Sequence, residues 1–285
     1  MPERNQEDVK ALLGQTLAVH NHGFVRLVDA MGDDAAIVQA ARISYGPGTK
    51  SRRSDRLLIR YLMRHRHTTP FEMVELKFHI KAPIFVARQL MRHRTASINE
   101  VSGRYSEMRE EFYLPTLDAV KPQSTTNRQG RAEDPFPADQ AAQVIEEWTS
   151  SQAETYALYR RHLDQGLSRE IARISLPNAL YTEWYWKVNL HNCFHFLSLR
   201  LDPHAQEEIR AYAEEVARCT RAVAPVAYEA FEEYVLGAVT FSRSEMDLLR
   251  KLLRSEKLCP EDLDHSRTWR QEFEARLGTA LPEVE

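Results

Sequence analysis

Polar and apolar residues alternate from Val74 to Lys81, and this segment carries the clearest secondary-structure signal in the chain. Its apolar members occupy every second position, at Val74, Leu76, Phe78 and Ile80. Alternation with a period of two residues predicts a β-strand that buries one face and exposes the other to water. A first strand is predicted earlier, over residues 24–28.

Apolar residues recur at helical spacing through much of the remaining chain. A helix over residues 54–65 is expected to bury Leu57, Leu58, Tyr61 and Leu62. Acidic residues favour the N-terminal end of another helix, predicted over residues 33–43. Further helices are predicted over residues 138–165, from Ser168 to Pro177, and from Asp202 to a bend or end near Pro225. The fold class is therefore α+β, with a small antiparallel sheet in the first third and a helix-rich second half.

Two segments show little periodicity. Residues 45–48, with the sequence Tyr-Gly-Pro-Gly, predict a turn or loop. Residues 118–137 are rich in Pro, Gln, Ser, Thr, Asn and Gly, and we expect a mobile loop that could act as a lid. Residues 238–285 predict two charged helices, which would form a C-terminal appendage to a main domain of residues 1–237.

Composition narrows the function classes. The chain has 285 residues, 43% of them hydrophobic, which suffices for one large domain or two small ones. Its net charge of −3 argues against a general nucleic-acid binder, which would carry a basic excess. No apolar run suggests a signal peptide or membrane span, so we expect a soluble, cytoplasmic protein. Three cysteines without a C-x-x-C pair argue against structural zinc and a disulfide scaffold.

Residues 81–108 form an arginine-rich segment that could bind an anion. A helix is predicted to start at Ala82-Pro83, and Arg88 and Arg92 then share one face, because they are four residues apart. After Arg94 the sequence turns to Thr, Ser, Asn and Gly, which predicts a loop. Guanidinium groups, hydroxyls and backbone N–H groups together suit a phosphate. A surface ion-pair cluster with Glu107, Glu110 and Glu111 is the alternative.

Other candidate sites are weaker. His65 with His67, and His191 with His195, have spacings that could bind a metal, but the second pair lacks the glutamate of H-E-x-x-H, and we expect no metal. Cys193 and His195 are two residues apart and point in different directions on a helix, which argues against a cysteine nucleophile. Arg173 and Arg200 stand among apolar residues and could each pair with an acid. Asp202 is the obvious partner for Arg200.

The sequence resembles the flavin-dependent thymidylate synthases over roughly residues 20–237. The resemblance rests on Arg92-His93-Arg94-x-x-Ser97-x-Asn99-x-x-Ser102-x-Arg104-Tyr105, a motif of fixed residues at fixed offsets. It extends to His67-x-Thr69-Pro70-Phe71-Glu72, Arg173-x-x-Leu176-Pro177 and Leu199-Arg200-Leu201-Asp202. By this resemblance dUMP would contact Gln89, Leu90, Met91, Arg92, Glu100, Val101, Ser102, Gly103, Arg104, Arg173 and Arg200. FAD would contact His67, Thr69, Arg92, His93, Arg94, Glu100, Asn189, Leu190, His191 and His195.

The resemblance also implies a reaction. Arg173 would hold the dUMP phosphate, and Arg200 would be the catalytic residue that stabilises the N3-deprotonated uracil and so activates C5. 5,10-Methylenetetrahydrofolate would donate the carbon, and FAD reduced by NADPH would supply the hydride, without an enzyme cysteine nucleophile. A homotetramer with active sites between subunits is implied. Some family members carry Arg and Asn at the positions of His191 and His195, which weakens the flavin assignment there.

Two rival functions remain at this point. One is a flavoenzyme or nucleotide enzyme of different specificity on the same scaffold. The other is a non-catalytic protein that binds RNA or a nucleotide through the arginine-rich segment. Flavin absorbance of the purified protein would separate the two enzymes from the binding protein, and dTMP formation would decide between the enzymes.

Overall fold

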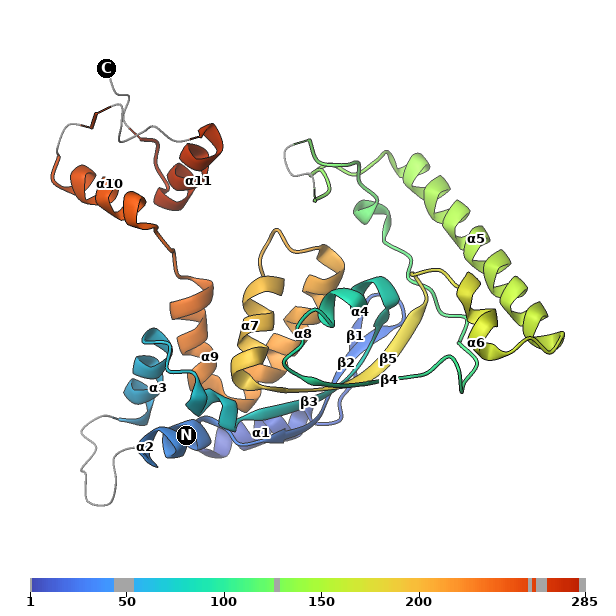
Figure 1. Ribbon diagram of the computed structural model, residues 1–285, viewed down its shortest axis with the longest axis horizontal. Helices are drawn as coiled ribbons and strands as arrows, with labels where there is room; N and C mark the ends of the chain where they lie inside the picture. The colour runs from blue at the N-terminus through green and yellow to red at the C-terminus, as the bar shows by residue number, and fades with distance from the viewer. Residues whose placement is uncertain (1, 44–53, 126–128, 256–257, 260–265, 282–285) are drawn as a thin grey trace. The chain divides into compact units, whose positions relative to one another are not determined.

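The computed structural model describes residues 2–43, 54–125, 129–255, 258–259 and 266–281. The chain divides into two compact units, Met1–Val235 and Leu236–Glu285 (Figure 1). The sequence-based boundary after residue 237 lies two residues from this division. The turn predicted at residues 45–48 lies outside the described residues, as do residues 126–128 of the predicted loop.

A five-stranded antiparallel sheet forms the centre of the larger unit. Its strands are β1 (Leu17–Val19), β2 (Gly23–Met31), β3 (Glu75–Pro83), β4 (Ser97–Glu100) and β5 (Tyr181–Asn189), in the order β1-β2-β3-β5-β4. The alternating segment is β3, as predicted, and Leu76, Phe78 and Ile80 are fully buried. Phe78 lies opposite Trp186 of β5, and the two rings stack at 5.7 Å.

Helices of the first third precede and follow the early strands. They are α1 (Pro2–Leu12), α2 (Asp34–Arg42), α3 (Asp55–Arg64) and the 3-10 helix η2 (Thr69–Met73). The predicted helices α2 and α3 are confirmed, and Asp33 and Ser54 cap them through side-chain oxygens. The expected buried face of α3 was partly wrong. Leu58, Ile59 and Leu62 are buried, whereas Leu57 is 57% exposed.

The arginine-rich segment contains more regular structure than expected. Helix α4 (Ile84–Leu90) begins directly after Pro83, as predicted. The loop predicted after Arg94 was wrong in part, because Ser97–Glu100 form strand β4 on the outer edge of β5. All four residues of β4 are exposed, so no hydrophobic alternation marks this strand. Pairing with β5 therefore determines its conformation.

The second half mixes helices with the central strand β5. The helical elements are η3 (Leu117–Ala119), α5 (Ala138–Asp164), α6 (Arg169–Ala172), η4 (Arg173–Ser175), α7 (Leu190–Arg200), α8 (Glu207–Val223), α9 (Pro225–Phe231) and the π-helix η5 (Glu232–Leu236). Helices α5 and α6 and the break before Pro225 match the predictions. Two expectations were wrong. The strands are not confined to the first third of the chain, because β5 lies beyond it. Helix α8 starts at Glu207 and not at Asp202.

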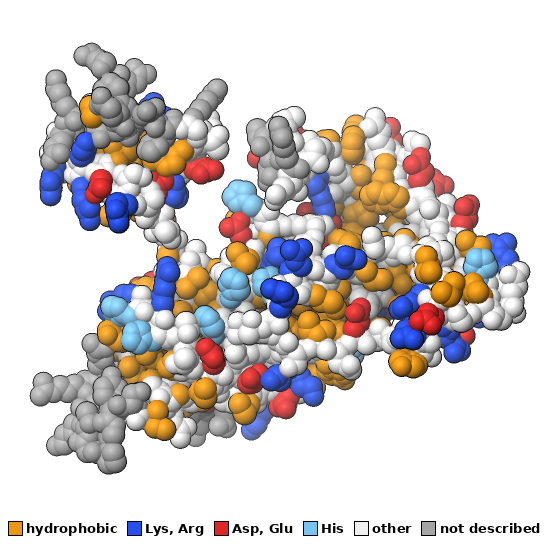
Figure 2. All heavy atoms as spheres, viewed as in Figure 1, with side chains coloured by type: hydrophobic (Ala, Val, Ile, Leu, Met, Phe, Trp, Pro, Cys, Tyr) orange, Lys and Arg blue, Asp and Glu red, His pale blue; other side chains and the backbone are white. Residues whose placement is uncertain are grey.

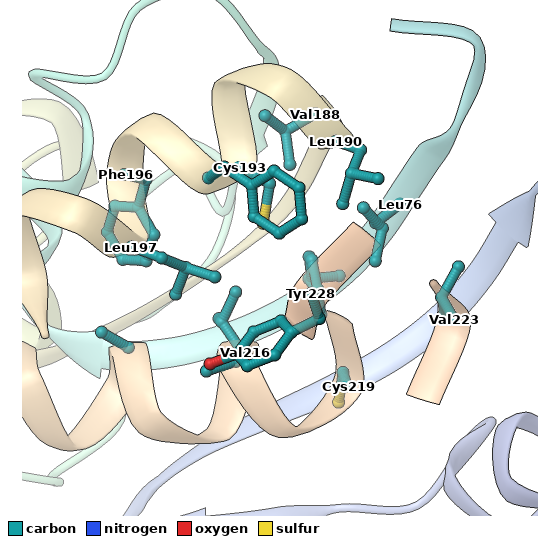
Figure 3. Packing of buried hydrophobic residues seen from close by; sticks show 14 of the residues in the cluster. Leu76, Val188, Leu190, Cys193, Phe196, Leu197, Val216, Cys219, Val223 and Tyr228 are labelled. Carbon is teal, nitrogen blue, oxygen red and sulfur yellow. The ribbon is translucent and has the colours of Figure 1, made fainter. Parts of the chain in front are cut away.

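One hydrophobic core joins the sheet to α7, α8 and α9. Trp186 of β5 packs on Phe196 of α7 at 5.2 Å between ring centroids. Figure 3 shows Cys193 and Leu197 of α7 pointing toward Val216 and Tyr228 across this core. Burial of so many large side chains holds α7 against the sheet. Helix α4, whose Val86, Ala87 and Leu90 belong to the same core, and the exposed side of α7 therefore have a rigid support.

The smaller unit is built from α10 (Arg243–Leu253) and α11 (Arg267–Leu277), which confirms the two predicted helices. Leu248, Phe273 and Leu281 form its own small core. Ser242 caps α10, and the buried carboxylate of Glu245 completes the capping box and pairs with Arg276 of α11. Among the described residues, no helix of either unit combines the length and apolar character that a membrane span requires.

Candidate functional site

A pocket of about 300 Å³ lies between the end of α4 and the exposed side of α7. The residues that line it are Arg92, His93, Arg94, Thr95, Val188, Asn192, His195, Leu199 and Arg200. Figure 2 shows Lys and Arg side chains with histidines beside them near the middle of this face. The structure thus brings Arg200 to the motif around Arg92, although the two positions are far apart in the sequence.

The pocket is strongly cationic. Three arginines line it, and none of the lining residues is acidic. Partial burial, followed by the nearby charge of Arg92, lowers the pKa of Arg200 from its ordinary value. Without an acidic residue in the pocket lining, the guanidinium groups of Arg92 and Arg200 repel each other, and a bound anion relieves that repulsion. The arrangement therefore favours a negatively charged ligand.

His93 fixes the orientation of Arg200. The guanidinium Nε of Arg200 donates a hydrogen bond to Nε2 of His93 over 3.2 Å. Burial, then the charges of Arg200 and His195, lowers the pKa of His93 to about 4. His93 is therefore neutral near pH 7, and its remaining proton is on Nδ1, because Nε2 acts as the acceptor. The ring also packs edge-on against Phe196 at 5.0 Å.

The alternative pairing of Arg200 with Asp202 is wrong. The carboxylate of Asp202 instead accepts hydrogen bonds from the backbone N–H of His204 at 2.7 Å and from its ring. These bonds lower the pKa of Asp202. Arg200 consequently keeps its charge available for the pocket.

A second cluster forms around Gly103 and Arg173. A Cβ atom on Gly103 would lie 3.1 Å from Cδ of Arg173 and 3.0 Å from Sδ of Met108, so glycine allows a close approach here. Arg104 pairs with the carboxylate of Glu170 at 3.1 Å, and Arg173 donates to the backbone carbonyl of Glu170 at 3.4 Å. The structure therefore joins Arg173, the expected phosphate ligand, to Arg104, another expected dUMP contact. None of these residues lines the first pocket.

Glu170 is a functional candidate that sequence reasoning missed. Its carboxylate forms an ion pair with Arg104, a residue that an anionic ligand would contact. Both side chains are about half exposed. The only sequence signal is its position three residues before Arg173, which places the two on one side of a helical turn. An acid at this place competes with a phosphate for Arg104.

Glu100 is the last residue of β4. Its carboxylate accepts a short hydrogen bond of 2.6 Å from the hydroxyl of Thr182 on β5. Within the described residues, no arginine forms an ion pair with Glu100, so its carboxylate can also accept from a ligand. The next residue, Val101, is held by a backbone hydrogen bond to Glu183.

The other expected flavin residues surround the start of α7. Helix η2 packs against α7 through Phe71 and Phe194, which places His67 and Thr69 on the same side of the unit. Both side chains are exposed. Asn189 caps α7, and its side-chain oxygen accepts from the backbone N–H of Asn192 at 2.9 Å. His67, Thr69 and Asn189 are thus grouped near the N-terminal part of α7, where a ligand could reach them.

Some expected ligand residues can contribute only through the main chain or indirectly. Leu90 and Leu190 are fully buried, so their side chains belong to the core. Met91 and His191 are partly exposed. Gln89 donates a hydrogen bond to Gln206, a residue that the motif analysis did not identify. Ser102 accepts a hydrogen bond from the backbone N–H of Arg104 at 3.3 Å and so shapes the turn.

The cysteines offer no activated thiol near the pocket. Cys193 and Cys219 are buried in the core, and burial raises the pKa of each thiol to about 12. Cys259 is exposed and lies in the smaller unit. Across the part of the chain that the structure describes, no group of three or more His, Cys, Asp or Glu side chains is placed to hold a metal ion.

Comparisons with known proteins agree with this geometry. Residues 26–226 match the family model described as thymidylate synthase complementing protein. The chain is 54% identical to a flavin-dependent thymidylate synthase of Ruegeria pomeroyi, with 91% of this chain and 87% of that protein covered. It is also 54% identical to the enzyme of the same name from Gluconobacter oxydans, over 88% and 84% of the two chains.

A solved structure shares the fold. It is the UMP/dUMP methylase PolB from Streptomyces cacaoi bound with 5-Br UMP, with a TM-score of 0.69 and 37% identity. The match covers 77% of this chain and 98% of that one. A second structure of the same methylase, bound with 5-Br dUMP, matches equally well, with a TM-score of 0.69.

Proposed function

This chain belongs to the flavin-dependent thymidylate synthases, and we propose that it converts dUMP to dTMP with 5,10-methylenetetrahydrofolate as carbon donor and NADPH as reductant. The observation that carries the proposal is the cationic pocket in which neutral His93 orients Arg200. Such a pocket suits a uracil ring that carries negative charge. The related methylase bound to a brominated dUMP supports a uracil nucleotide as the ligand.

Arg200 is the proposed catalytic residue. Attack on the folate carbon requires electron density at C5 of uracil, and deprotonation of N3 provides it. A fixed cation beside the ring stabilises the charge that develops there, and such preorganised groups are often worth about 10²–10³ in rate. His93 contributes by accepting from Nε, which leaves the terminal nitrogens of the guanidinium free for the ring.

The second cluster is the proposed phosphate site. Arg104, Arg173, the hydroxyl of Ser102 and the N–H groups near Gly103 offer the donors that a phosphate needs. In the free chain Glu170 partly neutralises this cluster. Helix α6, which carries Glu170 and directly precedes Arg173, lies away from α7 in Figure 1. This supports a site completed by two subunits, in which one chain supplies Arg200 and the partner the phosphate ligands. A homotetramer of this kind is part of the proposal.

The residues near α7 fit FAD. A pocket of about 300 Å³ is at the lower end of the range for small-molecule sites, so it can hold only part of a dinucleotide. Arg92, Arg94 and the acid-free lining suit its diphosphate, and His67, Thr69, Asn189 and His195 offer neutral donors and acceptors nearby. Reduced flavin, when bound, supplies the hydride for the reaction. The protein binds, orients and excludes water.

One experiment tests the function. The purified chain should show flavin absorbance and should form dTMP from dUMP, methylenetetrahydrofolate and NADPH. A yellow protein that binds dUMP without producing dTMP would favour a flavoenzyme of another specificity. A colourless protein that binds nucleotides would favour the non-catalytic alternative.

A further inference from the structure

A buried carboxylate, Glu208 of α8, lies beneath the end of α4. Its side chain is 4% exposed. It accepts hydrogen bonds from the hydroxyl of Tyr113 at 2.9 Å, from Nε2 of Gln206 at 2.8 Å and from Arg131. Burial alone would raise the pKa of Glu208, but the bonds and charge of Arg131, together with Gln206, outweigh it and lower the pKa. Glu208 is therefore ionised at neutral pH and can only accept hydrogen bonds.

This carboxylate fixes the orientation of two side-chain amides in series. The amide of Gln206 must turn its NH₂ group toward Glu208, because the reverse orientation would place two acceptors against each other. Its oxygen then faces Gln89 and accepts from Nε2 of that residue. One of the two N–H groups of the Gln89 amide is thereby used. Within the described residues, the side-chain oxygen of Gln89 has no hydrogen-bond partner.

Gln89 stands close to the proposed nucleotide site. It occupies the last turn of α4, three residues before Arg92, which lines the pocket. This relay, from Glu208 through Gln206 to Gln89, therefore fixes the Gln89 amide and leaves its oxygen and its second N–H available to a nucleotide bound at the site. dUMP offers two neutral donors, the N3–H of uracil and the 3′-hydroxyl of the sugar. Since the N3 position is assigned to Arg200, the 3′-hydroxyl is the remaining match.

We propose that Gln206 is a positioning residue, which, held by Glu208, orients the Gln89 amide so that its oxygen accepts from the 3′-hydroxyl of the nucleotide. This inference rests on the proposed function, because it requires dUMP at the site. It adds a specificity for the sugar that neither the Arg92 motif nor the phosphate cluster explains. Gln206 itself does not touch the substrate.

A ligand pair isolates this interaction. dUMP and 2′,3′-dideoxyuridine 5′-monophosphate differ only in the 3′-hydroxyl. A neutral hydrogen bond corresponds to about a three- to tenfold difference in affinity, and we expect the flavin-loaded wild-type protein to show that ratio by isothermal titration calorimetry. Gln206→Met keeps the side-chain length but removes both amide groups. In this variant the ratio should fall to about one, chiefly because dUMP binds more weakly.

Gln206 is a suitable position for the test. It is the residue before α8, but its side chain makes no cap hydrogen bond, so its replacement leaves the helix start intact. Gln152 provides a matched control, because it is a nearby glutamine that bonds to the carbonyl of Tyr113 outside the relay. Gln152→Met should retain the wild-type ratio. Gln89→Met should abolish it, and combining it with Gln206→Met should cause no further change.

The outcomes are distinct. A merely structural role of Gln206 would weaken both nucleotides equally and preserve the ratio, which would overturn the inference. A ratio of about one in the wild-type protein would overturn it as well. If Gln206→Met does not fold, the ratio in Gln89→Met decides, since a wild-type value there excludes the Gln89 oxygen as the acceptor. Failure of the wild-type protein to bind either nucleotide would instead reject the proposed function.

Discussion

Replacing His93 by phenylalanine tests the link between the two halves of the cationic pocket. The variant keeps an aromatic ring against Phe196 but removes the acceptor for Nε of Arg200. A hydrogen bond from a charged group contributes roughly 1.5–3 kcal/mol. We take the lower end because the pocket is open to solvent, which corresponds to about a tenfold loss in kcat/KM. The affinity for dUMP should change less, since the phosphate ligands are untouched.

The assay is dTMP formation at saturating FAD, with the flavin content of each variant measured first, because His93 is also an expected flavin contact. His93→Gln supplies a matched control, since its amide oxygen can reach the position of Nε2 and accept from Arg200, and it should retain more activity than His93→Phe. Equal activity of His93→Phe and the wild type would refute the role of His93. So would a glutamine variant as impaired as the phenylalanine variant.

Three further predictions concern charge. Arg104→Ala should weaken dUMP binding about tenfold to a hundredfold in a titration while the flavin content stays near normal, because it removes a charge-assisted bond to the phosphate. Glu170→Gln should tighten dUMP binding by up to about fivefold in the same titration, since an exposed ion pair contributes little and no longer competes for Arg104. His93 should stay neutral down to about pH 4 in an NMR titration. Because the unfolded chain binds its proton near pH 6.5, the stability that His93 contributes should be complete above pH 6.5 and be lost as the pH falls toward 4.

The sequence predicted those elements that bury one face and expose the other to solvent. Strand β3 alternates cleanly, so Leu76 and Phe78 identified it. Strand β5 also alternates, but Tyr185 occupies an exposed position and α7 follows without a break, so the aromatic run concealed the strand. Strand β4 has no buried position at all. Its pairing with β5 is a tertiary effect that local sequence does not encode.

The site was predictable in composition but not in geometry. The motif identified Arg92, His93 and Arg94, and the resemblance added Arg200. That His93 accepts from Arg200 could not be predicted, because 107 residues separate them and Asp202 was the nearer partner. Gln206 and Glu208 were missed for the same reason. Their role depends on a buried hydrogen-bond relay that forms only when α4 and α8 meet.

The most direct test of the central claim compares two variants in dTMP formation from dUMP, methylenetetrahydrofolate and NADPH. Substitution of Cys193, Cys219 and Cys259 together should leave the rate within about tenfold of the wild type, because both core thiols are buried with a pKa near 12 and no thiolate is needed. Arg200→Ala should lose about 10²–10³ in rate, because it removes the cation beside the deprotonated ring. Circular dichroism and flavin content must first show that each variant is folded. A folded, flavin-loaded cysteine variant without activity, together with an active Arg200→Ala enzyme, would contradict the account.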